Sequence, residues 1–344
     1  MSRLRLLLLV AGAGTLLAGL PANAAVRPLA DPAPGGSATG QTRALQLLSA
    51  ASRAARVRSY SGTQYVSTWH DDSASSSVAD IRHAATGGSV VTVRPTPGAA
   101  SDAAVTPTAD LDPRLVTLLA DNYILGVTSD TTCAGRAAHV VEARRPGGNV
   151  AGRFWVDASS ALLLRRETFD SAGRLVRSSA FSSLTVGAAT PTADAGPPAA
   201  LDQSTVDSLR RDGWQIPSSL AGDLELYDAR MRIHGGKPVL HLSYSDGLST
   251  LSLFAQRGSL GVARMAGFHK QTLGRNAVWV RPSSPERVVW GGGGRVFTLL
   301  SDAPPEAVRA AVTGLPHEKA HRAGLLARLG RGLARVASWL NPFT

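Results

Sequence analysis

Residues 153–181 read RFWVDASSALLLRRETFDSAGRLVRSSAF, and this stretch decides the fold. Its apolar and polar residues alternate in short runs that are separated by the turn-forming segments DASS and DSAG, a pattern typical of antiparallel strands. We therefore predict a meander of three strands over residues 151–156, 162–169 and 175–186. The stretch holds no cluster of nucleophiles or metal ligands, which favours a binding or sensing protein over an enzyme.

The N-terminus predicts export. Arg3 and Arg5 precede an apolar run over residues 6–20, and the small residues 22–24 follow it, as in a cleavable signal peptide. The apolar run is shorter than a bilayer-spanning helix, although an uncleaved anchor stays an alternative. We expect cleavage after Ala24 and a mature protein located outside the cytoplasm, in the periplasm or cell envelope.

The charge balance is strongly basic, with 36 Lys and Arg against 25 Asp and Glu. Loss of Arg3 and Arg5 with the signal peptide leaves 34 basic residues and a net charge near +9. Such an excess usually indicates nucleic acid, but export argues against that partner. Anionic lipid headgroups, acidic wall polymers or an acidic segment of a partner protein are the better candidates.

Cys133 is the one cysteine in the sequence, so the chain cannot form an intramolecular disulfide. Its neighbours in sequence include no basic side chain that would activate it, which favours an unreactive thiol. No cofactor is expected.

Composition predicts two domains. Residues 187–204 are rich in Ala, Pro, Thr and Gly, which marks a linker between two β-rich regions. The predicted organisation is a signal peptide (1–24), a disordered leader (25–40), an N-terminal domain (41–190), a linker (191–204), a β-rich C-terminal domain (205–316) and a basic amphipathic helix (317–344). The predicted fold class is α+β, mainly antiparallel β, with helices that cover one face of a curved sheet.

Further elements follow from periodicity and turn residues. Residues 71–77 are polar and predict a loop, whereas Ser245–Gly247 is a strong hairpin signal between strands at 240–244 and 250–254. Helices are expected at residues 42–57, 114–123, 206–212 and 304–313.

The C-terminal helix is amphipathic. Its apolar stripe includes Leu325, Leu329 and Leu333, and arginines occupy most of the opposite side. It can dock onto its own domain, bind a partner, or make peripheral contact with an anionic membrane, and the sequence leaves these three alternatives open.

Three motifs invite a catalytic interpretation. His317–His321 matches the zinc-binding pattern HExxH, but no third ligand follows it before the C-terminus. Gly291–Gly294 is followed by strand residues rather than by a lysine or a helix, which favours a hairpin over a phosphate loop. Asp157, Glu167 and Asp170 could form a carboxylate pair, but the two aspartates lie in predicted turns, where Asp is ordinary.

Aromatic residues gather on the strands of the first domain. On a curled sheet they could line an apolar cavity for acyl chains, although packing in the core is the commoner role of such side chains. The candidate ligand-binding residues are Tyr60, Tyr65, Trp69, Phe154 and Trp155.

Several segments together resemble the exported MucB/RseB family. They include Tyr60–Thr63, Arg153–Asp157, Arg177–Phe181, Gly213–Trp214, Tyr244–Leu248, Asp302–Pro304, Leu315–His317 and Trp339–Phe343. The resemblance implies a half-open barrel with helices, like that of the lipoprotein carriers LolA and LolB, and a smaller β-rich C-terminal domain. The Ala-, Arg- and Gly-rich composition, the Pro-rich insertions and the basic tail depart from the family pattern.

The resemblance also implies a function. Family members bind the extracytoplasmic part of a single-span anti-sigma factor, restrain its proteolysis, and respond to lipidic envelope-stress ligands. The candidate partner-binding residues here are Tyr244, Asp246, Phe254, Trp290 and Trp339. A lipid or lipoprotein carrier that uses the same cavity, and a zinc-dependent hydrolase, are the alternatives.

Overall fold

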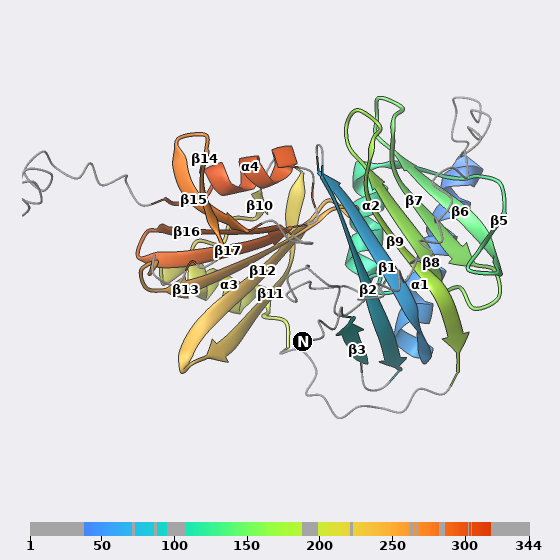
Figure 1. Cartoon of the computed structure of the whole chain (residues 1–344), viewed down its shortest axis with the longest axis horizontal. Coiled ribbons are helices and arrows are strands. Elements are labelled where there is room, and N and C mark those ends of the chain that lie inside the picture. The colour runs from blue at the N-terminus through green and yellow to red at the C-terminus, as the bar shows by residue number, and fades with distance from the viewer. Residues whose placement is uncertain are drawn as a thin grey trace, which may run out of the picture. The chain divides into compact units, whose positions relative to one another are not determined.

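The computed structural model describes residues 38–317, except 71–72, 86–87, 95–107, 188–198, 221–222, 262–264, 266, 282–285, 302 and 304. The predicted signal peptide, most of the leader and the C-terminal helix beyond His317 lie outside these residues. The described residues form two antiparallel β-sheets and four α-helices (Figure 1).

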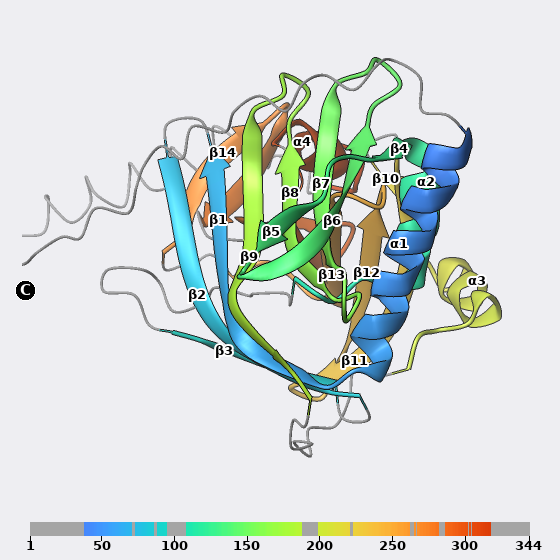
Figure 2. The ribbon, with the colours of Figure 1, turned by 90° about the vertical axis from the view of Figure 1, so that its right-hand side faces the viewer.

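The first sheet is built from the strands of the N-terminal half. Its strands follow one another in the order β3-β2-β1-β9-β8-β7-β6-β4, and β5 pairs with β6. Figure 2 shows these strands as a curved sheet, with the long helix α1 beside β4 and β6. The strands are β1 (Tyr60–His70), β2 (Ser73–Ala84), β3 (Gly88–Val93), β4 (Ile124–Val127), β5 (Thr131–Cys133), β6 (Arg136–Arg144), β7 (Val150–Asp157), β8 (Leu163–Phe169) and β9 (Leu175–Val186).

Two helices cover part of the concave face of the first sheet. Helix α1 (Ala38–Val57) packs through small residues and leucines, including Ala44, Leu48 and Ala51, against side chains of β4, β6 and β7. Helix α2 (Pro113–Asn122) joins the same cluster, and its N-cap Asp112 accepts a hydrogen bond from the backbone N–H of Arg114 at 2.8 Å. The helices therefore cover the part of the concave face that β4, β6 and β7 form.

The predicted meander is confirmed. Strands β7, β8 and β9 pair antiparallel in chain order, and their bounds differ from the predicted bounds by one residue at most. The DASS segment turns between β7 and β8, where Ala161 takes a left-handed conformation (φ 60°). The turn of Asp170–Gly173 joins β8 to β9, with Gly173 at φ 80°.

The second sheet is an eight-stranded antiparallel sheet in the order β10-β11-β12-β13-β17-β16-β15-β14. One of its faces is covered by helices α3 (Gln203–Arg211) and α4 (Pro305–Thr313), whose apolar residues join the core of the sheet. The strands are β10 (Ser219–Leu220), β11 (Leu224–His234), β12 (Lys237–Ser245), β13 (Thr250–Arg257), β14 (His269–Leu273), β15 (Asn276–Arg281), β16 (Glu286–Gly292) and β17 (Arg295–Ser301).

The predicted α+β class, with mainly antiparallel β structure, is confirmed by this topology. The loop expected over residues 71–77 is wrong for residues 73–77, which begin β2. Their backbone pairs with β1, where Ser67 lies opposite Ser76 and Trp69 opposite Ala74, and this pairing prevails over the polar composition. The domain boundaries drawn from composition stay a prediction.

Candidate functional site

A polar cleft of about 300 Å³ lies between inner surfaces of the two sheets. Strands β8 and β9 of the first sheet, and β11, β12 and β13 of the second, contribute to its walls. The lining residues are Thr108, Asp110, Asp112, Leu115, Arg166, Thr168, Arg177, Ser179, Tyr227, Asp228, Arg230, His241, Ser243, Thr250 and Ser252. Hydroxyl and charged groups dominate, so the cleft suits a polar segment of polypeptide better than an acyl chain.

The charged groups of the cleft are held in place by neighbours. Arg230 donates to Asp228 at 2.6 Å, and Arg166 lies over the ring of Phe154 at 5.6 Å from its centroid. The ring of His241 stacks on Phe254 at 4.3 Å between centroids. Burial lowers the pKa of His241 below its ordinary value, which favours the neutral imidazole at pH 7.

The two sheets meet at a tight turn. We call Ser245–Leu248 the SDGL turn; it joins β12 to β13 and contacts α2 and β7. Leu248 belongs to the core cluster of the first sheet, and its carbonyl accepts a hydrogen bond from Arg166. A side chain at Gly152 would overlap Leu248, so the glycine of β7 provides the space that this leucine fills.

Asp246 orders the SDGL turn and links it to α2. Its Oδ1 accepts from the backbone N–H groups of Leu248 and Ser249 at 2.8 and 2.6 Å, and its Oδ2 accepts from the Tyr123 hydroxyl at 2.7 Å. Burial, with the nearby Asp246 charge, raises the pKa of Tyr123 far above its ordinary range, so the phenol stays a donor. Asn122 adds a hydrogen bond to the Asp246 carbonyl at 3.2 Å.

A second hollow, a groove of about 390 Å³ with both apolar and polar lining residues, lies on the same face of the second sheet as part of the cleft. Alternate residues of β13 connect the two hollows, since Thr250 and Ser252 line the cleft and Phe254 and Gln256 line the groove. The remaining groove residues are Ser259, Leu260, Gly261, Met265, Phe268, Arg287, Val289, Val296, Thr298 and Leu300. One strand therefore runs along both hollows, and its residue Phe254 adds an aromatic ring to the groove.

The five predicted ligand-binding aromatics do not gather around one cavity. Tyr60 and Phe154 are buried in two different core clusters on the concave side. Tyr65 and Trp69 are 49% and 37% exposed, on the side of β1 opposite to the buried Val66 and Thr68. Their ligand-binding role stays a prediction.

Trp155 lies with Tyr65 on the outer side of the sheet. It follows Phe154 directly in β7, so the two side chains point to opposite faces, and its ring lies 4.9 Å from the guanidinium of Arg165. The spacing of the aromatics in sequence carried this information, because residues one or five apart on a regular strand cannot share a face.

The predicted partner-binding residues differ in accessibility. Tyr244 and Trp290 are buried in the core of the second sheet; the Tyr244 hydroxyl donates to the Pro217 carbonyl at 2.9 Å, and Trp290 Nε1 donates to the Pro316 carbonyl at 3.1 Å. Phe254 is half-buried and lines the groove, whereas Asp246 is engaged in the SDGL turn. Trp339 lies outside the described residues.

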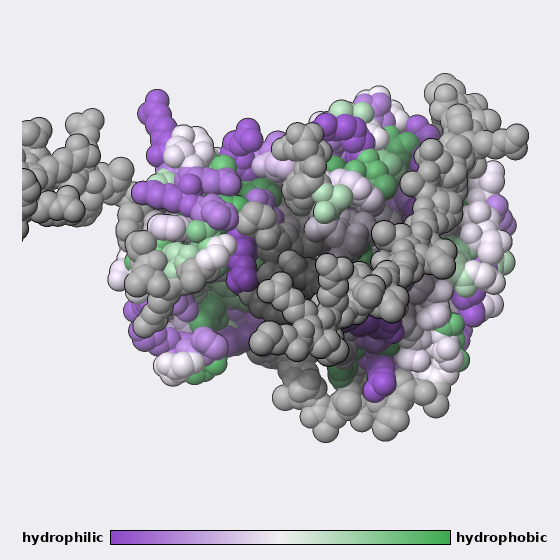
Figure 3. Space-filling view, viewed as in Figure 1, coloured by the Kyte–Doolittle hydropathy of each residue, from purple (hydrophilic) through white to green (hydrophobic). Residues whose placement is uncertain are grey.

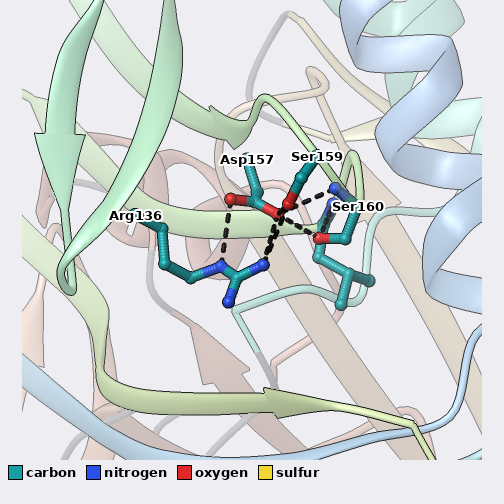
Figure 4. A network of polar contacts seen from close by, with 5 residues as sticks. Arg136, Asp157, Ser159 and Ser160 are labelled. Carbon is teal, nitrogen blue, oxygen red and sulfur yellow. Dashed lines mark hydrogen bonds and ion pairs between the residues drawn. The ribbon is translucent and has the colours of Figure 1, made fainter.

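Three carboxylates of the meander are engaged by arginines. Asp157, which is 2% exposed, accepts two hydrogen bonds from Arg136, at 3.0 Å each, and others from Ser159 and Ser160 (Figure 4). Burial would raise the pKa of Asp157, but these hydrogen bonds outweigh it and hold the pKa far below its usual range. An aspartate held in this way is ionised and fixed, which suits a structural role.

Glu167 and Asp170 are held similarly, by Arg165 and by Arg174. In the part of the chain that the structure describes, no group of three or more His, Cys, Asp or Glu side chains is placed to hold a metal ion. The HExxH motif extends beyond that part. Its described member, His317, stacks on Trp290 and is bonded to the Val312 carbonyl at 2.7 Å.

The surface drawn in Figure 3 carries hydrophilic and hydrophobic residues in small neighbouring patches. No helix of the described residues is both long and apolar enough to cross a membrane. Cys133 is half-buried, and burial raises the pKa of its thiol.

The fold defines a protein of two antiparallel sheets, with helices packed on part of the concave face of the first. Residues 89–200 match the MucB/RseB N-terminal domain family. The resemblance to the MucB/RseB family that the sequence predicts is confirmed by this match. No curated protein matches the chain in sequence.

Solved structures of similar proteins include MucB. The chain is 23% identical to the MucB of the Pseudomonas aeruginosa MucA/MucB complex, over 80% of this chain and 100% of that one, with a TM-score of 0.40. A crystal structure of MucB is 22% identical over 79% of this chain and 98% of that one (TM-score 0.47). A LolA superfamily protein from Nitrosomonas europaea is 10% identical over 76% and 91% of the two chains (TM-score 0.19).

Proposed function

We propose that this protein is an exported regulator that binds the extracytoplasmic part of a single-span anti-sigma factor and restrains its proteolysis. The observation that carries this function is the family match over residues 89–200, in a chain whose two sheets enclose a polar cleft. The partner in the MucA/MucB complex indicates the kind of protein to test first.

The face of the second sheet that runs along β13 is the proposed docking surface. An extended segment of about eight residues spans roughly 26 Å, which is the length of β13 itself. Such a segment can place polar groups against Thr250 and Ser252 and an apolar side chain against Phe254. Buried aromatic anchors usually supply most of the binding energy at such surfaces, so Phe254 is the residue of largest expected effect.

Binding is tested by calorimetry with the purified extracytoplasmic segment of a single-span anti-sigma factor from the same organism. We expect a dissociation constant in the micromolar range or below for the wild type. Phe254→Ala is expected to weaken binding about tenfold, because it removes an apolar anchor worth roughly 1.4 kcal/mol.

Ile233→Ala is the matched control. Ile233 is also an apolar residue of the second sheet, but it is 70% exposed, lies at the end of β11 and lines neither hollow. Affinity should be unchanged in this variant. The absence of binding by the wild type at micromolar concentration would contradict the proposed function, and equal losses in the two variants would contradict the proposed surface.

A lipidic ligand is the second part of the proposed function. Tyr60 and Phe154 are 1% and 0% exposed, so an acyl chain could reach them only if the groups that cover them, α1 among them, moved away. Helix α1 packs largely through alanines, which bury little apolar surface per residue and lower the cost of such a movement. The carrier alternative needs the same opening.

Extraction of the purified protein and mass spectrometry of the extract test the lipidic ligand. A lipid present in about one copy per chain, and reduced in a Phe154→Ala variant that remains folded, is the expected result. Lipid-free protein that also takes up no lipid from vesicles would remove both the sensing role and the carrier alternative, while leaving the binding of the anti-sigma factor intact.

A further inference from the structure

Two arginines face each other where β13 ends and β17 begins. Arg257 lies directly opposite Arg295 in the antiparallel ladder, and the Gly258 N–H donates to the Gly294 carbonyl just beyond them, at 3.0 Å. Residues directly opposite each other on antiparallel strands have Cβ atoms about 5 Å apart, so two like charges in such a pair repel each other. We call these two residues the arginine pair.

Both members of the arginine pair lie over the same ring. The guanidinium carbons of Arg257 and Arg295 are 5.7 and 5.0 Å from the centroid of Trp214, whose buried side chain belongs to the core of the second sheet. The indole therefore orders both cations beside an apolar surface, where an electrostatic interaction is stronger than in open water.

The pair lacks a counter-ion within the residues that the structure describes. No carboxylate there lies within ion-pairing distance of either guanidinium, whereas Glu142, Asp157, Glu167 and Asp170 of the first sheet each pair with arginine. Arg295 donates to the Gly293 carbonyl at 3.3 Å, while its Nε is buried without a hydrogen-bond partner. Arg257 is exposed, so the position is open to a ligand.

We propose that the arginine pair binds a phosphate group. A tetrahedral phosphate presents several oxygens, which can accept from two guanidinium forks at once, and its charge would offset the repulsion between the two cations. A phospholipid headgroup and free phosphate share this chemistry. The site is independent of the proposed binding of an anti-sigma factor.

Calorimetric titration of the full mature chain with inorganic phosphate, at constant ionic strength, tests the site. The double variant Arg257→Gln/Arg295→Gln is expected to bind phosphate at least tenfold more weakly than the wild type. The matched control is Arg232→Gln/Arg275→Gln, which removes the same charge from two exposed positions of the second sheet and is expected to bind like the wild type. This control separates the site from the general attraction of a basic protein for anions.

Vesicles distinguish the source of the phosphate. If a headgroup is the ligand, the wild type and the control bind phosphatidylglycerol vesicles at least threefold more tightly than the double variant; a difference with inorganic phosphate alone indicates free phosphate. Should the double variant fail to fold, Arg257→Gln alone is expected to weaken phosphate binding at least threefold. The proposed site would be overturned if wild-type and Arg257→Gln proteins bound phosphate equally well. It would also be overturned if the control variant lost as much phosphate affinity as the double variant.

Discussion

Replacing Gly247 by alanine is expected to destabilise the protein by about 3 kcal/mol. Gly247 has φ 93°, a conformation that a residue with a side chain adopts at a cost of about 1–2 kcal/mol. Its added Cβ would also overlap the backbone of α2, where it would meet the Leu119 nitrogen and lie 2.8 Å from the Leu115 carbonyl oxygen. Separating the helix from the SDGL turn adds roughly 1–3 kcal/mol, as in an overpacked core.

Gly173→Ala is the control for backbone strain alone. Gly173 has a similar φ of 80°, but nothing lies within 4 Å of the position of its missing Cβ. Urea unfolding should show a loss of about 1–2 kcal/mol for this variant, clearly smaller than that for Gly247→Ala. Equal losses would mean that α2 and the SDGL turn are not in the close contact described here.

The second large effect is expected for Asp157→Asn. This change keeps the size of the side chain but removes the negative charge that Arg136 and two serines bind. The Arg136 guanidinium then loses its counter-ion at a nearly buried position. Breaking such a pair costs about 3 kcal/mol or more. Asp80→Asn is the comparison, since Asp80 and Arg94 are both solvent-exposed and their pair is expected to contribute far less.

The contribution of Asp157 also depends on pH. Folding lowers the pKa of this carboxyl below its value in the unfolded chain, which is near 4. The ionised carboxylate therefore stabilises the folded protein fully above about pH 4, and this stabilisation is lost as the pH falls below that value. The difference in unfolding free energy between wild type and Asp157→Asn should therefore be constant from about pH 5 to 7 and shrink in more acidic solution. A difference that does not change with pH would show that the carboxylate charge is not what stabilises the turn.

The meander was predictable because its signals are local. The DASS and DSAG turns and the alternation of β7, β8 and β9 lie in adjacent residues, and the structure reproduces them. The strands that the sequence prediction missed include β11 and β14. β11 carries charged residues at its centre, where Asp228 and Arg230 face the cleft, and β14 is a polar, exposed edge strand, so neither has the apolar alternation on which a sequence prediction depends.

The candidate site was less predictable, because it depends on contacts between distant segments. The hairpin at Ser245–Gly247 could be predicted, but the docking of Leu248 onto Gly152 and α2 joins residues about 100 positions apart. The only local signals of this contact were the glycines themselves, Gly152 beside Leu248 and Gly247 beside α2. Likewise, alternation along β1 separates Tyr65 from Val66, but only the packing of the helices shows which of them faces the core.

Protection of a partner from proteolysis tests the central claim most directly. The extracytoplasmic segment of the anti-sigma factor is incubated with the envelope protease that makes the first cut, with and without this protein, and the cleavage rate is measured. We expect the wild type at saturating concentration to slow cleavage at least tenfold, and Phe254→Ala to protect only at about tenfold higher concentration. A cleavage rate that the wild type leaves unchanged, under conditions in which the segment is bound, would contradict the proposed function.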